Sequence, residues 1–108
     1  MSEGTEFMAE VDAEGYLVEP ADWTEAFAVA TAAREGITLG EDHWRAIRFM
    51  RAWIEEHGVA PDARHVMKHL TGDRETGRTV LFGLFPYGYV KQACRIAGMK
   101  RPRAWSTG

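Results

Sequence analysis

The stretch from Glu41 to His57 constrains the fold more than any other part of the sequence, because it has the pattern of a complete amphipathic helix. Acidic residues open it, His57 closes it and Gly58 follows, which suits the helix dipole and a left-handed C-cap. Its apolar residues recur at helical spacing, namely Trp44, Ile47, Met50 and Ile54, with Phe49 and Trp53 widening the stripe. The stretch predicts a helix with one buried face, which the other elements must cover.

The opposite side of this predicted helix carries a ridge of arginines, Arg45, Arg48 and Arg51. Such a ridge could grip an anion. Its spacing also suits ion pairs with Glu41, Asp42 and Glu55 on a solvated face. The sequence favours the solvated face.

Three further helices and a C-terminal helical segment follow from capping signals and apolar spacing. Asp22 and Glu25 have capping-box spacing and open a helix that ends at Glu35 before Gly36. Pro61 opens a helix that stops at Gly72. The polar stretch 72–77 is predicted as a loop, and helices are predicted over 78–85 and 89–97.

The N-terminal part predicts the one sheet of the fold. Apolar residues alternate before and after the tetrad 12–15, whose Asp12 and Gly15 suit a type I turn with the glycine in the left-handed region. We therefore expect a β-hairpin over 6–18, then a bundle of about five orthogonal helices over 22–98, and a flexible C-terminal arm over 99–108. The expected class is mainly α, with a small β element (α+β).

Length and composition indicate a single soluble domain. A chain of 108 residues is long enough for one modest core. No apolar run has the length of a membrane span, and the acidic start is unlike a signal peptide, so we expect a cytoplasmic protein without membrane insertion. His65 and His69 stand four apart, but no third ligand accompanies them, so we expect neither a metal nor a cofactor.

The net charge of −3 conceals an asymmetry along the chain. All 16 acidic residues lie at or before Glu75, whereas six of the 13 basic residues follow it. These six are Arg78, Lys91, Arg95, Lys100, Arg101 and Arg103. Such an end could meet an acidic protein surface, nucleic acid or the chain's own acidic body.

Cys94 is the only cysteine, so the 108 residues hold no internal disulfide. Val90, Ala93, Cys94 and Ala97 follow helical spacing, which places the thiol on the inward face, where a small buried hydrophobe is the simplest interpretation. If the sulfur were partly exposed, Lys91 and Arg95 would favour its thiolate.

The C-terminal residues resemble a known family. The motifs 84–88 (LFPYG), 91–95 (KQACR), 97–98 (AG) and 100–102 (KRP) are similar to the C-terminal region of the DsrC/TusE family of sulfur-relay proteins. Family landmarks also match upstream, at 14–17 (EGYL), 22–23 (DW), 41–44 (EDHW) and 60–61 (AP). The resemblance covers nearly the whole chain.

The resemblance implies a small helical bundle with an N-terminal hairpin and a mobile C-terminal arm. It also implies sulfur metabolism, with a persulfide carried on a cysteine at the tip of the arm and passed between protein partners. Trp105 occupies the position of that tip cysteine, and Cys94 matches the family's upstream cysteine. The chain thus resembles a member that keeps the docking body and lacks the usual sulfur-carrying residue.

Three functions follow as hypotheses. The first is a regulatory or non-catalytic protein that docks to sulfite reductase or sulfurtransferases through Lys91, Arg95, Lys100, Arg101, Arg103 and Trp105. The second is a sulfurtransferase that accepts sulfane sulfur on Cys94. The third is a DNA-binding regulator that uses the loose helix-turn-helix pattern of the helices before and after 58–60 together with the basic arm, although the acidic body disfavours close approach to DNA.

Overall fold

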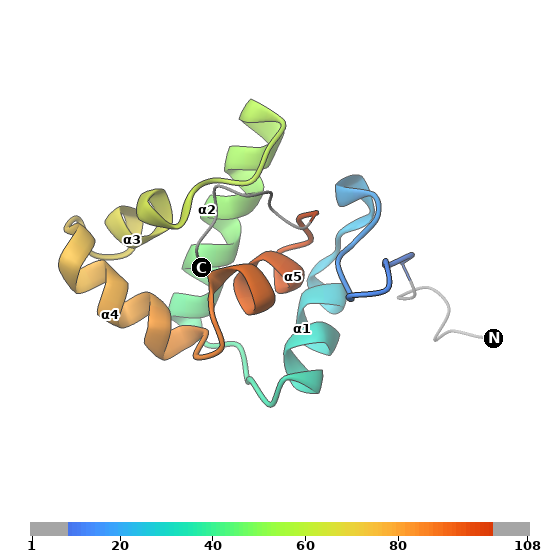
Figure 1. Cartoon of the computed structure of the whole chain (residues 1–108), viewed down its shortest axis with the longest axis horizontal. Helices are drawn as coiled ribbons and strands as arrows, with labels where there is room; N and C mark the ends of the chain where they lie inside the picture. Colours follow the sequence, from blue (N-terminus) through green and yellow to red (C-terminus); the bar gives the residue numbers. More distant parts are fainter. Residues whose placement is uncertain (1–8, 101–108) are drawn as a thin grey trace.

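The computed structural model describes residues 9–100, and helices dominate this range (Figure 1). The elements are the 3-10 turn η2 (Pro20–Asp22), α1 (Glu25–Arg34), α2 (Glu41–His57), α3 (Ala63–Thr71), α4 (Arg74–Leu84), the π-helical segment η3 (Tyr89–Ala93) and α5 (Cys94–Ile96). The mainly helical class predicted from the sequence is confirmed. α2 has the predicted bounds, and Gly58 caps it with φ +79°.

The N-terminal part forms the predicted turn but little sheet. The Gly15 amide donates to the Asp12 carbonyl at 3.0 Å, and Gly15 has φ +91°. Within residues 9–100 the strand-type pairing consists of one isolated antiparallel bridge between Val11 and Leu17. Residues 6–8 of the predicted hairpin lie outside the described range, so a hairpin over 6–18 stays a prediction.

Helix α1 begins later than predicted. Thr24, and not Asp22, is its N-cap, because the Thr24 hydroxyl accepts a hydrogen bond from the Phe27 amide at 3.0 Å. Asp22 lies in the turn η2, which precedes the helix. The Trp23 indole donates to the Ile96 carbonyl at 2.9 Å. This distant contact accompanies an extended Trp23 backbone, and the helix starts at Glu25, two residues later than an Asp22 cap would place it.

Helices α3 and α4 form a closely packed pair. Asp62 caps the start of α3 and Gly72 its end, as predicted. The loop predicted over 72–77 is wrong, since the Asp73 carboxylate accepts from the Thr76 amide at 2.8 Å and α4 begins at Arg74. A Cβ on Gly77 would stand 2.0 Å from the Met67 carbonyl oxygen. Gly77 therefore permits close helix contact and does not mark a loop.

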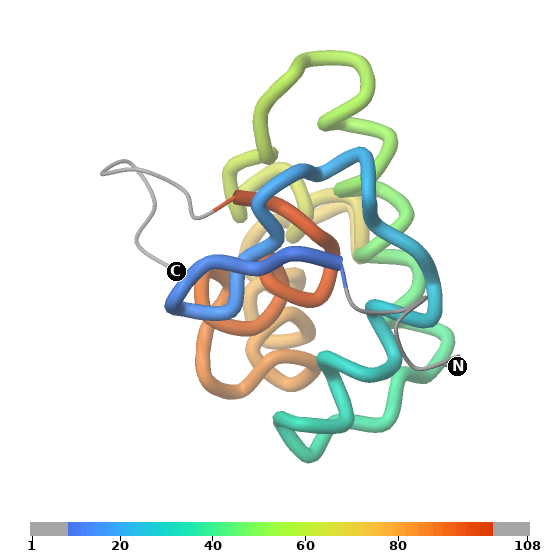
Figure 2. The backbone as a smooth tube through the Cα atoms, turned by 90° about the vertical axis from the view of Figure 1, so that its right-hand side faces the viewer, coloured from blue at the N-terminus to red at the C-terminus, as the bar shows by residue number. Residues whose placement is uncertain are grey.

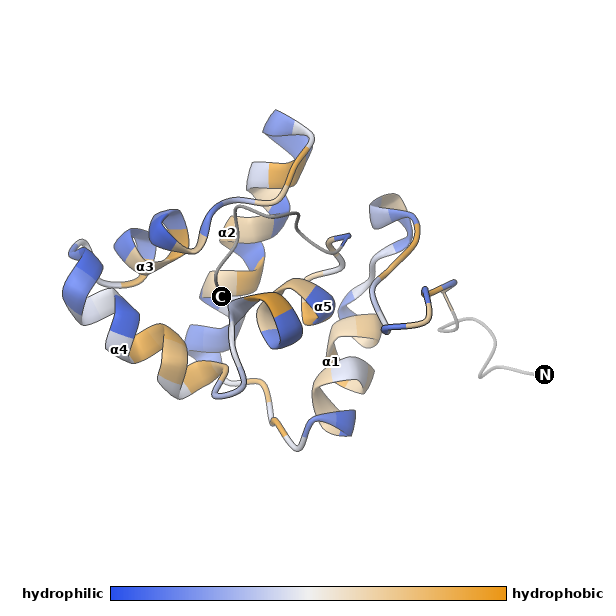
Figure 3. Cartoon of the chain, viewed as in Figure 1, coloured by the Kyte–Doolittle hydropathy of each residue, from blue (hydrophilic) through white to orange (hydrophobic). Residues whose placement is uncertain are grey.

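The C-terminal segment η3–α5 lies between α1 on one side and the α3–α4 pair on the other (Figures 1 and 2). It supplies much of the core, because Tyr89, Ala93, Cys94 and Ile96 are all buried. Figure 3 shows that α4 is hydrophilic at its start and hydrophobic toward its end, where it approaches this segment. No helix of residues 9–100 is long and apolar enough to cross a membrane.

Candidate functional site

The segment that carries Cys94 is wound more widely than an α-helix. Gly88, with φ +110°, leads into it after the turn at Pro86. The Cys94 amide then donates to the Tyr89 carbonyl, five residues back, and normal helical bonding resumes when Ala97 donates to Ala93 at 2.9 Å. The helix predicted over 89–97 is confirmed in position. The wider turn brings a polar side chain, Gln92, inside beside the apolar ones.

The Cys94 thiol is fully buried, as its place on the inward face predicted. Burial raises the pKa of the Cys94 thiol to about 12, although a hydrogen bond with the Tyr89 side chain acts in the opposite direction. The Tyr89 hydroxyl donates to the Pro61 carbonyl oxygen at 2.5 Å. Burial, and secondly Cys94, raise the pKa of Tyr89. The thiol therefore lies in a buried setting beside the Tyr89 hydroxyl, and burial strongly disfavours its thiolate.

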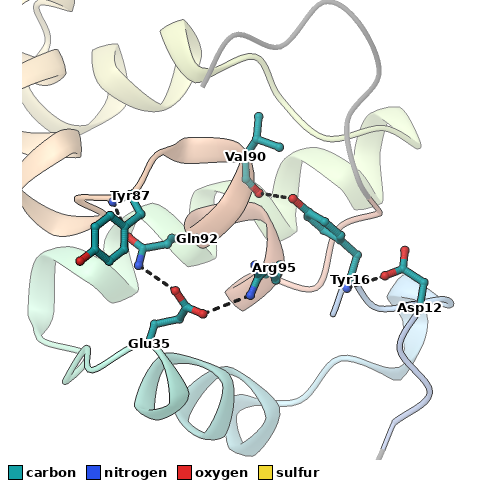
Figure 4. A network of polar contacts seen from close by, with 7 residues as sticks. All are labelled: Asp12, Tyr16, Glu35, Tyr87, Val90, Gln92 and Arg95. Carbon is teal, nitrogen blue, oxygen red and sulfur yellow. Dashed lines mark hydrogen bonds and ion pairs between the residues drawn. The ribbon is translucent and has the colours of Figure 1, made fainter. Parts of the chain in front are cut away.

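A polar network joins this segment to the end of α1 (Figure 4). The Glu35 carboxylate accepts from the Gln92 amide nitrogen at 3.0 Å and from Arg95 Nη1 at 3.1 Å. The Gln92 side-chain oxygen in turn accepts from the Tyr87 amide at 2.9 Å. A buried glutamine and a half-buried arginine thus share one carboxylate from a distant element, while the buried Arg95 Nε has no hydrogen-bond partner among residues 9–100.

The N-terminal turn closes over the same segment. The Tyr16 hydroxyl donates to the Val90 carbonyl at 3.0 Å, and the Arg95 guanidinium lies 5.6 Å from the Tyr16 ring centre (Figure 4). The Asp12 carboxylate accepts from the Tyr16 amide at 3.0 Å and so fixes the turn. Arg95, predicted as a partner-binding residue, is consequently engaged inside the protein.

The other predicted partner-binding residues divide into two groups. Lys91 and Lys100 are exposed, on η3 and just beyond the end of the C-terminal helix. Arg101, Arg103 and Trp105 lie outside the described residues. Met99, which the sequence assigned to the start of the arm, is fully buried, and its amide donates to the Cys94 carbonyl at 2.9 Å. The body therefore continues through Met99.

The arginine ridge of α2 does not behave as a unit. Arg45 and Arg48 are exposed and form ion pairs, Arg45 with Asp42 at 3.1 Å and Arg48 with Glu25 at 3.7 Å, as a solvated face requires. Arg45 Nη2 also donates to the Leu70 carbonyl of α3 at 3.1 Å. Arg51 differs in that its one guanidinium donates to carbonyls of two segments, Pro20 of η2 and Ala97 at the end of α5. Desolvation by burial lowers the pKa of Arg51, and the Glu55 charge acts to raise it. Helical periodicity carried no signal for this role.

The two histidines of α3 are exposed, as predicted, and stack on aromatic rings of α2. His65 lies 4.5 Å from the Trp53 ring centre, and His69 lies 4.4 Å from that of Phe49. No group of three or more histidine, cysteine, aspartate or glutamate residues with metal-binding geometry occurs in 9–100. In the described part of the chain these histidines serve the contact between α2 and α3.

Fold and site together define a small helical protein with one buried thiol, in which polar contacts anchor the segment η3–α5 on the body. The chain belongs to the DsrC-like family: the family model described as "DsrC like protein" matches residues 3–104. The sulfurtransferase TusE of Yersinia pseudotuberculosis is 42% identical over 96 residues, which are 86% of this chain and 89% of that protein. TusE of Sodalis glossinidius is 43% identical over 102 residues, covering 92% and 93% of the two chains.

Solved structures agree with this assignment. The oxidized gamma-subunit of the dissimilatory sulfite reductase (DsrC) from Archaeoglobus fulgidus superposes with a TM-score of 0.77 at 35% identity, covering 89% of this chain and 90% of that one. DsrC of Allochromatium vinosum gives a TM-score of 0.75 at 40% identity, with 87% of each chain covered. The family resemblance predicted from the sequence motifs is confirmed.

Proposed function

We propose that this protein docks to sulfite reductase or to sulfur-relay partners in a regulatory or non-catalytic role. One observation carries the proposal: the only cysteine of the 108 residues, Cys94, is fully buried. Sulfane sulfur moves by thiolate attack, and the two sulfur atoms must come within bonding distance. A chain whose single thiol is enclosed and protonated lacks an accessible group for that step.

The names of the relatives support partners of this class. TusE is named a sulfurtransferase, and DsrC a gamma-subunit of dissimilatory sulfite reductase. We propose that docking uses the exposed Lys91 and Lys100 together with Arg101, Arg103 and Trp105. Trp105, at the position of the family's tip cysteine, would enter the partner as an apolar anchor, since tryptophan often dominates binding energy at interfaces.

Isothermal titration with purified dissimilatory sulfite reductase, and separately with a sulfurtransferase, tests the proposal. We expect binding by the full chain, about tenfold or greater weakening in Trp105→Ala and partial retention in Trp105→Phe. Arg34→Ala, an exposed change on α1, is the matched control and should bind as the parent does. Equal affinities of the parent and Trp105→Ala would remove Trp105 from the interface, and absence of binding to either class would overturn the proposal.

A second candidate function comes from the sulfurtransferase name of the relatives. In that case the Cys94 thiolate attacks the outer sulfur of a donor persulfide, forms Cys94–S–SH and releases the donor thiolate. Intact mass after incubation with a persulfidated donor decides between the two functions. We expect no sulfur adduct on the folded chain, and an adduct lost in Cys94→Ser would favour the second function instead.

A further inference from the structure

Three segments that are distant in sequence meet where the helical body ends: the turn η2, the middle of α2 and the residues that follow α5. Arg51 of α2 stands at the centre of this junction. Arg51 Nη1 donates to the Ala97 carbonyl at 3.0 Å and to the Gly98 carbonyl at 3.4 Å, while Nη2 donates to the Pro20 carbonyl at 2.9 Å. One guanidinium therefore joins the turn η2 to the end of the C-terminal helix.

Trp23 completes the junction. Its ring lies under the Arg51 guanidinium, 4.8 Å from the ring centre to Cζ, and its indole N–H donates to the Ile96 carbonyl at 2.9 Å. Gly98 has φ +78°, and a Cβ there would come within 2.4 Å of Trp23 Cδ1. The backbone of Gly98 is thus pressed against the indole in a conformation that favours glycine.

The contacts concentrate on the last residues before the arm. Three successive carbonyls, those of Ile96, Ala97 and Gly98, are held by side chains from elsewhere, and Met99 is buried directly after them. A cation at the C-terminal end of a helix is also favoured by the helix dipole. An ordinary helix end packs without a guanidinium that donates to carbonyls of two different segments, so the Arg51 contact is additional to normal packing.

We propose that Arg51 is a positioning residue that sets the direction in which the chain leaves the body after Met99. The guanidinium fork fixes the last two carbonyls relative to η2, and Trp23 fixes the plane in which they lie. The importance of this direction for docking rests on the proposed function. The geometric role of Arg51 is independent of that function.

Spin labels test the geometric role without any partner. One label is placed at Val29→Cys, an exposed position of α1 that is 52% accessible, and the other at Arg101→Cys. The buried Cys94 should stay unlabelled, which mass measurement checks. Pulsed electron–electron double resonance then measures the distribution of distances between the two labels.

Arg51→Lys is the informative variant, because lysine keeps the charge but carries all its donors on one nitrogen. It cannot reproduce the planar fork that reaches carbonyls of two segments. We expect the distance distribution to broaden and its mean to shift in Arg51→Lys, and more so in Arg51→Met. Arg48→Lys and Arg48→Met, on the same helix at a 67% exposed side chain, should leave it unchanged. A distribution in Arg51→Lys that superposes on the parent's overturns the proposal, even if the variant is less stable.

If Arg51→Met fails to fold, Trp23→Phe replaces it, since phenylalanine keeps a ring but lacks the indole donor. Trp23→Phe should broaden the distribution in the same way, and an unchanged distribution would again contradict the proposal. A double-mutant cycle of binding affinities separates the geometric role of Arg51 from the docking proposal. If docking occurs, the losses of affinity in Arg51→Lys and Trp105→Ala should not be additive, because both act through the same segment.

Discussion

Arg95 Nη1 lies 3.1 Å from Glu35 Oε2, and the two side chains are 25% and 24% exposed. This pair joins the end of α1 to the helix that carries Cys94 across 60 positions of sequence. The second carboxylate oxygen of Glu35 accepts from Gln92. One acidic side chain therefore accepts from two donors of the C-terminal segment, and this network adds to the burial of the segment's apolar face.

Glu35→Gln should destabilise the protein by about 1–3 kcal/mol. An amide has one acceptor oxygen, so its NH₂ group would face either Arg95 or Gln92, donor against donor. Urea unfolding measures the loss. Glu56→Gln is the matched control, because the Glu56 side chain is 79% exposed and its single ion pair, with His57, is long at 3.9 Å. The stability of this variant should differ from the parent's by less than about 0.5 kcal/mol. Equal effects of the two changes would contradict the role of the network.

The Cys94 thiol should resist alkylation in the native protein. Its pKa of about 12, against an ordinary value of 9.0, lowers the thiolate fraction near pH 8 by about 10³ relative to an unfolded chain, and burial slows access further. Iodoacetamide labelling followed by mass measurement, with and without denaturant, checks this. Native labelling within a factor of ten of the unfolded rate would show that the thiol is accessible.

Stability should fall in alkaline solution because of Cys94. Its folded pKa is raised, so the folded thiol keeps its proton between about pH 9 and 12 while the unfolded chain loses it. The contribution is complete below pH 9 and declines by about 1.4 kcal/mol per pH unit above it. Tyr89, whose pKa is also raised from 10.0, adds to the decline at higher pH.

Urea unfolding at pH 8.0, 9.0, 9.5 and 10.0 measures this decline. Cys94→Ala should be less stable at pH 8 but should lack most of the decline below pH 10. Parallel curves for the parent and Cys94→Ala would show that the thiol is not the titrating group.

Two glycines of α4 should respond to alanine in opposite directions. Gly77→Ala should cost about 2–3 kcal/mol, because the new Cβ would meet the Met67 carbonyl and force α3 and α4 apart. Apart from its chain neighbours and its own helix backbone, Gly83 has no heavy atom within 4 Å of its Cβ position, so Gly83→Ala should stabilise the helix by about 0.5 kcal/mol. Thermal unfolding of both variants tests this, and loss of stability in both would place the effect in the helix and not in the contact.

Local signals predicted the elements whose cause lies within a few residues. The apolar stripe of α2 and its cap Gly58 predicted both ends of that helix correctly. Asp62 and Gly72 marked the two ends of α3. The local signals failed in two places: Asp22 was predicted to cap α1, whose N-cap is Thr24, and Gly77 was predicted to lie in a loop. At Trp23 a contact with the distant Ile96 carbonyl accompanies the outcome, whereas the early start of α4 follows from the local Asp73 cap.

The sequence by itself determined the mainly helical class, the inward position of Cys94 and the membership of the DsrC-like family, because periodicity, capping and motifs are properties of neighbouring residues. The tertiary structure decided which charged side chains are free for other partners. Arg48 and Arg51 are three residues apart on one helix, yet Arg48 is exposed while Arg51 binds carbonyls of Pro20 and Ala97. Only the packing of α2 against the turn η2 and the end of α5 brings those carbonyls within its reach.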